Sequence, residues 1–220
     1  EVEVVNVGLT VREFVYVDAH NGRIIDQITG IHHALDREIS ETALANVVWD
    51  ESNGDPVPIP DGWAAGTVQQ VFDWNNEIDG SLETYNLFAS MSAGSYDSYD
   101  NAGSTMRTVN NDPNISCPNA NWNGTSTNYC SGVTGDDTVA HEWGHAYTEY
   151  TNGLIYQWQS GALNESYSDI WGEVVDLING RGTDDAPGSV RSDGSCSVFG
   201  VGAPSVDNSY RWLSGEDDPA

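Results

Sequence analysis

Two histidines four residues apart constrain this sequence more than any other feature. His141 and His145 lie in the segment Val139-Ala-His-Glu-Trp-Gly-His-Ala-Tyr147. Four residues make about one helical turn, so a helix would place both imidazoles on one face. On such a face two ring nitrogens can reach one zinc ion at about 2.0–2.1 Å, and the adjacent carboxylate of Glu142 can reach a water beside the metal. The segment therefore predicts a metal-binding helix over residues 137–151.

A chance occurrence of this pattern on an amphipathic helix is the alternative, and the next predicted helix, over residues 163–178, argues against it. A catalytic zinc of this kind needs a third protein ligand. Glu165 could supply it, and Asp169, one turn later, could accept the free N–H of a liganding histidine. A solvated acidic face is the other interpretation. We expect instead a largely buried helix, where carboxylates need partners, because it carries the apolar residues Ala162, Leu163, Ile170, Val174 and Leu177.

Together these segments resemble the thermolysin-like neutral zinc metalloproteases (gluzincins). The resemblance rests on His141-Glu-Trp-Gly-His145, on Gly153-Leu-Ile-Tyr-Gln157 and on Ser160-Gly-Ala-Leu-Asn-Glu165-Ser-Tyr-Ser-Asp169-Ile. It is dense over residues 119–176 and looser back to Trp63. The resemblance implies that zinc is held by His141, His145 and Glu165. It also implies that Glu142 is the general base, that Tyr156 donates a hydrogen bond to the oxyanion, and that Asp169 orients a histidine ligand.

An Asn-rich segment upstream, Asn119-Ala-Asn-Trp-Asn-Gly124, resembles the edge strand of that family. The resemblance implies that Asn119, Ala120 and Trp122 contact an extended peptide substrate, which would bind by adding a strand to the sheet. On the residues alone, a surface turn is an equal alternative.

Calcium is a second cofactor that the resemblance implies. Asp137, Asp176 and Asp184 fall at or near positions where the family holds calcium with acidic side chains. After Gly180 the sequence departs from the expected acidic pattern, and surface acids in an acidic chain are an equal alternative. His32-His33 could form another metal site, but a solvated linker is the favoured interpretation.

The charge balance excludes two classes of partner. The 220 residues include 7 basic and 34 acidic ones, a net charge of −27, which would repel nucleic acid and anionic membranes. No apolar run approaches the roughly 18 residues of a membrane span. Of three cysteines, Cys117 and Cys130 flank one short loop and could close it as a disulfide, which would indicate an oxidising compartment. Cys196 is then left without a partner.

The sequence divides into three expected regions. Residues 1–36 predict a β-hairpin and linker that resemble the last strands of a pro-region, with Asn21-Gly22 as the turn. Residues 37–152 would form an α+β amino-terminal lobe that includes a helix over 64–91, with an interruption near Gly80. Residues 153–220 would begin a helical lobe that stops before the family's carboxy-terminal histidine and arginine.

The resulting hypothesis is a secreted, monomeric zinc metalloendopeptidase made as a zymogen. It would cleave proteins and peptides before bulky apolar residues, using a zinc-activated water with Glu142 as the general base. Two rivals stay open: a zinc protein that does not cleave peptides, and an acidic calcium-binding module whose histidines are structural.

Overall fold

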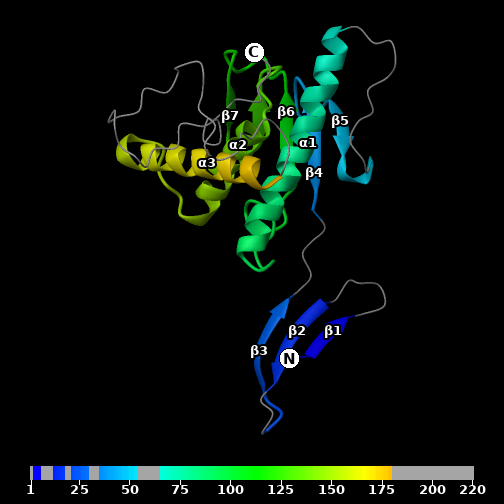
Figure 1. Ribbon diagram of the computed structural model, residues 1–220, viewed down its shortest axis with the longest axis vertical. Coiled ribbons are helices and arrows are strands. Elements are labelled where there is room, and N and C mark those ends of the chain that lie inside the picture. Colours follow the sequence, from blue (N-terminus) through cyan, green and yellow to red (C-terminus); the bar gives the residue numbers. More distant parts are fainter. Residues whose placement is uncertain (1, 6–11, 18–20, 30–34, 54–64, 180–220) are drawn as a thin grey trace.

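The computed structural model describes residues 2–5, 12–17, 21–29, 35–53 and 65–179, and it has the expected α+β composition (Figure 1). The strands are β1 Val2–Val5, β2 Arg12–Val17, β3 Ile24–Thr29, β4 Arg37–Glu41, β5 Val47–Asp50, β6 Met106–Asn110, β7 Ala120–Trp122 and β8 Thr127–Tyr129. The helices are the 3-10 turn η1 Glu51–Asn53 and the α-helices α1 Ala65–Met91, α2 Asp136–Thr151 and α3 Trp158–Asn179. None of the described helices is long and apolar enough to cross a membrane.

The amino-terminal strands form a sheet of their own. β2 and β3 make the predicted antiparallel hairpin, and Gly22 has a φ of 70° in its turn, a conformation that glycine adopts easily. β1 pairs with the other edge of β2, so the sheet has three strands in the order β1-β2-β3. The prediction of two strands was therefore incomplete, because the short run Val2–Val5 carries no turn signal of its own.

The second sheet has five strands in the order β5-β4-β6-β8-β7. β4, β6 and β8 are parallel, whereas β5 and β7 pair antiparallel to their neighbours and form the two edges. The short strand β7 is thus an edge strand, as the family resemblance implied for the segment that begins at Asn119.

The main hydrophobic core fixes α2 on this sheet. Four residues of α2 at helical spacing enter the core, and they meet residues of α1, β6, β8 and the loop before β6: Val139, Trp143, Ala146 and Tyr147 against Tyr85, Tyr99, Met106 and Tyr129. Trp143 is completely buried. This packing fixes the rotation of α2 and leaves His141 and His145 on another face.

Glycines lie where the three long helices approach one another most closely. A Cβ on Gly80 of α1 would lie 2.8 Å from Val139, and one on Gly172 of α3 would lie 2.6 Å from the carbonyl oxygen of Asp137. The predicted interruption of α1 near Gly80 is wrong, since the helix is continuous through it. This glycine permits a helix contact instead.

The helix α3 begins at Trp158, five residues before the predicted start, and its buried face is not the predicted one. It packs on α2 through small and polar residues, whereas Ala162, Leu163 and Ile170 are exposed and Val174 and Leu177 are half-buried. Because the two helices lie so close, large apolar side chains do not fit between them, and the buried residues include Gly161, Asn164, Ser168, Gly172 and Val175.

Candidate metal centre

Two packed helices bring the three predicted metal ligands together. His141 and His145 project from α2 and Glu165 projects from α3, and within the described part of the chain these three residues form a group whose ligand atoms could hold one metal ion. The Nε2 atoms of the two histidines are 3.0 Å apart. Glu165 Oε2 lies 3.3 Å from Nε2 of His141 and 3.7 Å from Nε2 of His145.

This spacing fits a zinc ion. Ligands about 2.0–2.1 Å from a tetrahedral centre lie roughly 3.3–3.4 Å from each other. The three atoms are 3.0–3.7 Å apart, within about 0.4 Å of the separation that zinc would impose. Three protein ligands also leave one tetrahedral position free, as a catalytic site requires. The residues therefore fit the metal that the sequence predicted.

The other nitrogen of each histidine has its own partner. Asp169 Oδ1 lies 3.0 Å from Nδ1 of His141. Asn164 Oδ1 lies 2.6 Å from Nδ1 of His145, and Ser168 Oγ lies 3.0 Å from the same atom. Acceptors at Nδ1 favour the tautomer that keeps the proton there and leaves Nε2 free to bind a metal.

Asn164 and Ser168 are functional positions that the sequence reasoning missed. They precede Glu165 and Asp169 by one residue each, so the same four-residue spacing repeats on α3. That repeated spacing was the feature of the sequence from which these two positions could have been predicted. Both residues are buried against α2, whereas Glu165 and Asp169 have side chains 40% and 57% exposed. The two acids are thus not the buried carboxylates that the sequence reasoning assumed.

The electrostatics of His141 favour metal binding. Burial lowers the pKa of this imidazole, and the neighbouring His145 lowers it further, while Asp169 and Glu165 act in the opposite direction. The result is a neutral ring near neutral pH, the form that can donate a lone pair to a cation.

Glu142 lies beside the ligands in a different environment. Its side chain is buried, and burial, followed by the negative charge of Glu165, raises the pKa of its carboxyl to about 8. A hydrogen bond from the backbone N–H of Trp122 acts against this rise. A carboxyl with a pKa near neutral can both accept and release a proton, and a divalent cation nearby would favour its charged form.

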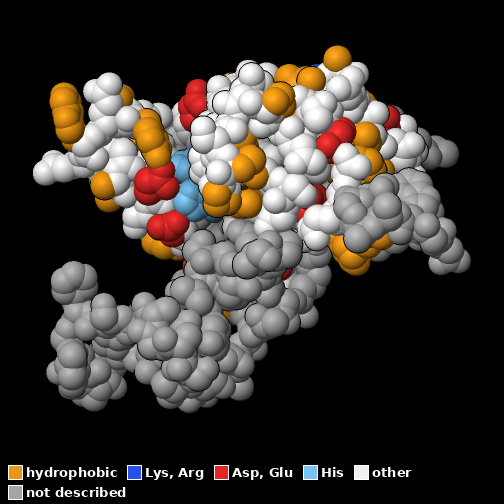
Figure 2. Space-filling view, turned by 90° about the horizontal axis from the view of Figure 1, so that it is seen from above, with side chains coloured by type: hydrophobic (Ala, Val, Ile, Leu, Met, Phe, Trp, Pro, Cys, Tyr) orange, Lys and Arg blue, Asp and Glu red, His pale blue; other side chains and the backbone are white. Residues whose placement is uncertain are grey.

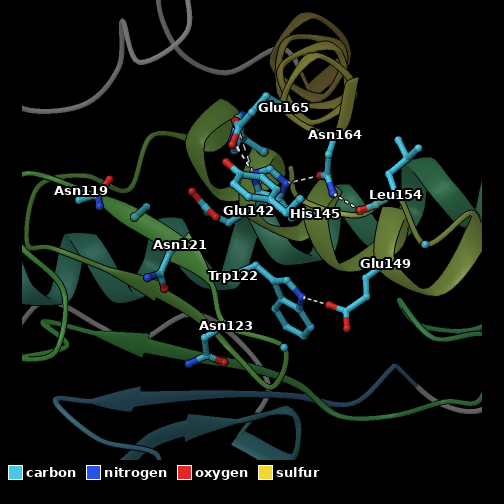
Figure 3. A pocket seen from close by; sticks show the side chains of 15 residues that line it. Asn119, Asn121, Trp122, Asn123, Glu142, His145, Glu149, Leu154, Asn164 and Glu165 are labelled. Atoms are coloured by element: carbon cyan, nitrogen blue, oxygen red, sulfur yellow. Dashed lines mark hydrogen bonds and ion pairs between the residues drawn. The ribbon is translucent and has the colours of Figure 1, made fainter. Parts of the chain in front are cut away.

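A cleft of about 750 Å³ runs between β7 and the helix face that carries these residues (Figure 3). In the space-filling view, histidine and acidic side chains meet on this face of the molecule (Figure 2). The cleft is lined by Asn119, Ala120, Asn121, Trp122, Asn123, Gly124, His141, Glu142, His145, Glu149, Gly153, Leu154, Tyr156, Asn164 and Glu165. The predicted substrate residues Asn119, Ala120 and Trp122 are among them.

The end of β7 is attached to α2. The indole Nε1–H of Trp122 donates a hydrogen bond of 2.7 Å to Glu149 Oε2, as Figure 3 shows. Glu149 is one helical turn after His145, so this bond ties the strand to the helix that carries the histidines. The sequence reasoning did not identify Glu149, because an exposed acid in an acidic chain is unremarkable on its own.

The loop between α2 and α3 places Tyr156 in the lining of the cleft beside His145. Its ring centroid lies 5.8 Å from that of His145, and the residue is 63% exposed. The amide N–H of Asn164 donates a hydrogen bond to the carbonyl of Leu154 in this loop. Asn164, whose oxygen contacts His145, therefore connects the loop to that histidine. A Cβ on Gly161 would lie 3.2 Å from the backbone of Tyr156, a tight contact, so the glycine lets the loop fold back closely on α3.

The predicted disulfide between Cys117 and Cys130 is present. Of the proposed calcium residues, Asp137 and Asp176 are buried near the start of α2, whereas Asp184 lies outside the described residues. Cys196 and the three remaining histidines, His20, His32 and His33, also lie outside them.

Known proteins similar to this chain agree with the geometry. A family model described as "Thermolysin metallopeptidase, alpha-helical domain" matches residues 152–190. A zinc metalloproteinase of Renibacterium salmoninarum is 42% identical over 113 residues, which are 48% of this chain and 20% of that protein. A bacillolysin of Brevibacillus brevis is 44% identical over 103 residues, 43% of this chain and 19% of that protein. A thermolysin of Alicyclobacillus acidocaldarius is 45% identical over 74 residues, 30% of this chain and 14% of that protein.

A solved structure supports the same relationship. It is the "Precursor of Protealysin, Metalloproteinase from Serratia proteamaculans", which matches with a TM-score of 0.51 and 25% identity over 68% of this chain and 45% of that one. The matched stretch spans a fifth or less of the length of the curated relatives. In sequence and in its α+β fold, this chain is similar to thermolysin-like zinc metalloproteases.

Proposed function

We propose that this chain carries the zinc-binding and catalytic core of a secreted endopeptidase that hydrolyses peptide bonds before bulky apolar residues. The observation that carries the proposal is the spacing of 3.0–3.7 Å among the three ligand atoms, in a cleft that also contains a buried carboxylic acid. Zinc held by His141, His145 and Glu165 would lower the pKa of a water and polarise the scissile carbonyl.

The residues around the cleft have distinct roles in this proposal. An extended peptide would pair with the backbone of β7 at Asn119 and Ala120, with Trp122 closing that wall. Glu142 would take a proton from the attacking water and give it to the leaving amine, and its position beside the ligands and its raised pKa support that role. Tyr156 would donate a hydrogen bond to the carbonyl oxygen as charge develops there. Preference for an apolar residue rests on the family resemblance alone.

Further parts of the proposal concern the rest of the protein. The sheet β1-β2-β3 would belong to a pro-region, since the chain is similar to a precursor. The regions 1–36, 37–152 and 153–220 would belong to the pro-region, the amino-terminal lobe and the helical lobe. A calcium ion would bind Asp137, Asp176 and Asp184. The disulfide supports export to an oxidising compartment. The mature protein would act as a monomer.

The decisive test separates zinc binding from peptide hydrolysis. We expect about one zinc per chain, and substitution Glu142→Gln should leave that zinc in place while reducing hydrolysis of a peptide substrate by at least about 10³-fold. Zinc content is measured by atomic emission and hydrolysis by release of a fluorescent peptide product. Glu149→Gln is the matched control, because it makes the same chemical change in the same cleft away from the metal ligands, and the glutamine oxygen can still accept the hydrogen bond from Trp122. Full hydrolysis by the Glu142→Gln variant would refute the general-base role.

A further inference from the structure

We propose that the Cys117–Cys130 disulfide positions the substrate strand β7, so that it sets the affinity for an extended peptide without acting on the metal centre. This inference rests on the proposed function, because it takes β7 to be the strand with which a peptide pairs. The bond is then a redox-sensitive control of substrate binding.

The strand β7 is a short edge strand, held to β8 by its ladder and by the amide of Asn128, which donates a hydrogen bond of 2.9 Å to Asn121 Oδ1. It has three residues, lies at the edge, and pairs on one side with β8 through Ala120↔Tyr129, Asn121↔Asn128 and Trp122↔Thr127. One more backbone bond, from the N–H of Cys130 to the carbonyl of Asn119 at 3.0 Å, extends the ladder. β8 also pairs with β6 on its other side, whereas β7 has a ladder on one side only, so β7 is the less restrained strand of this hairpin.

The disulfide closes the open end of this hairpin. At the other end a turn joins β7 to β8, with the side-chain oxygen of Asn123 accepting from the N–H groups of Thr125 and Ser126. Cys117 precedes β7 by three residues and Cys130 directly follows β8, with their Cα atoms 5.6 Å apart. The hairpin is therefore a covalently closed ring, which has fewer open conformations than an unlinked chain.

The two cysteines differ in how firmly they are anchored. Cys130 is 2% exposed, and the next residues, Ser131 and Gly132, donate hydrogen bonds of 2.7 and 3.1 Å to the buried carboxylate of Asp73 in α1. Cys117 is exposed, and the turn before it is closed by hydrogen bonds to Asp112 at its own start. The disulfide therefore transmits the anchoring of Cys130 to the segment that leads into β7.

The metal centre does not depend on this bond. The three ligands come from α2 and α3, and neither cysteine lines the cleft. The far end of β7 stays attached to α2 through Trp122 and Glu149. Loss of the disulfide should therefore loosen the strand near Asn119 and Ala120 while the ligand atoms keep their positions.

A phosphine can reduce the disulfide with one molecule of water, which gives two thiols and a phosphine oxide. The phosphorus atom attacks one sulfur and the S–S bond breaks. Water then supplies the oxygen of the phosphine oxide, and its two protons end on the two thiols. Cys117 is exposed, which gives the reductant access on that side.

The experiment compares the full chain, the double variant Cys117→Ser/Cys130→Ser, and Cys196→Ser as the control that keeps the disulfide. Zinc content is measured first, and then the dissociation constants of a tetrapeptide hydroxamate, which needs β7, and of acetohydroxamate, which needs the metal alone. We expect the double variant to keep its zinc, to bind the tetrapeptide about tenfold more weakly, and to bind acetohydroxamate within about twofold of the unchanged chain. KM for a peptide substrate should rise with kcat nearly unchanged.

A second measurement tests the inference without the double variant, in case that variant does not fold. The folded, unchanged chain is reduced with tris(2-carboxyethyl)phosphine, its fold is checked by circular dichroism, and affinity should return on reoxidation. Equal tetrapeptide affinity with and without the disulfide would overturn the inference, as would parallel loss of zinc and of both ligands. An unchanged chain that binds no zinc would instead refute the proposed function, and the inference with it.

Discussion

Each histidine of the metal centre has a different partner at its second nitrogen. Asp169 contacts His141, whereas Asn164 and Ser168 contact His145. An acid stabilises positive charge on the ring, but an amide oxygen mainly fixes its orientation. Because Asn164 is buried and also holds the carbonyl of Leu154, it couples the direction of one ligand to the loop that carries Tyr156.

Removal of that amide should weaken zinc binding. We expect Asn164→Ala to lower zinc affinity by about 10–100-fold, the usual effect of losing an outer hydrogen bond to a ligand. The measurement is competition with a chromophoric zinc chelator at fixed pH. Ser166→Ala is the matched control on the same helix, since its side chain is exposed. Equal zinc affinity in the two variants would show that Asn164 does not orient His145.

The sequence could predict the centre itself because its parts are close along the chain. His141, His145, Glu165 and Asp169 lie within 29 residues on two helices, where a four-residue spacing specifies a shared face. The bond between Trp122 and Glu149 was not predictable in the same way, because the position of β7 against α2 depends on a sheet assembled from distant strands. Long-range contacts leave no local pattern in the sequence.

At the scale of elements, the contact between α2 and α3 explains why the buried face of α3 was predicted wrongly. Apolar residues usually mark the buried side of a helix. Here the helices approach so closely that glycine, serine and asparagine occupy the contact, and Leu163 and Ile170 are exposed. The close approach is what brings Glu165 within 3.7 Å of His145.

A methyl group in this contact should therefore separate the helices. In Gly172→Ala the new Cβ would lie 2.6 Å from the carbonyl oxygen of Asp137, which is backbone and cannot move alone. We expect a net loss of about 1–3 kcal/mol in the free energy of unfolding, although alanine favours a helix by about 1 kcal/mol over glycine. Urea unfolding measures the loss, with Ser166→Ala as the exposed control. A more stable Gly172→Ala protein would contradict this packing.

The helix α1 contains a buried acid that should make stability depend on pH. Glu77 is completely buried, and neither carboxylate oxygen has a hydrogen-bond partner among the described residues. Burial raises its pKa well above the usual value, and the charges of Asp73 and Glu41 add to the effect. The folded state then holds a proton that the unfolded state releases, so the contribution of Glu77 to stability is greatest below the ordinary glutamate pKa of about 4.3 and falls as pH rises towards the raised pKa.

Substitution Glu77→Gln should remove this part of the pH dependence. The variant and the unchanged chain should have similar urea midpoints near pH 4.5, and the variant should become progressively more stable by comparison up to pH 8. Glu83→Gln is a control on the same helix. A constant difference between Glu77→Gln and the unchanged chain across this range would show that Glu77 keeps the same protonation state in both the folded and the unfolded protein.

At the scale of the whole molecule, the net charge of −27 opposes folding. The folded chain concentrates like charges that the unfolded chain spreads apart, so self-repulsion destabilises the compact state. Dissolved ions screen it over about 30 Å at 0.01 M, about 10 Å at 0.1 M and about 3 Å at 1 M. We therefore expect the melting temperature to rise with salt, most steeply between 0.01 and 0.2 M.

Different cations separate screening from specific binding. Sodium and tetramethylammonium chlorides should raise the melting temperature equally at equal ionic strength, because screening does not depend on ion size. Calcium chloride should raise it further at millimolar concentration only if a calcium site such as Asp137 and Asp176 exists. A melting temperature that falls over the first 0.2 M of sodium chloride would mean that attractive ion pairs, including Arg37 with Glu51, outweigh the repulsion. Because acidic residues outnumber basic ones by 34 to 7, the repulsive term should dominate.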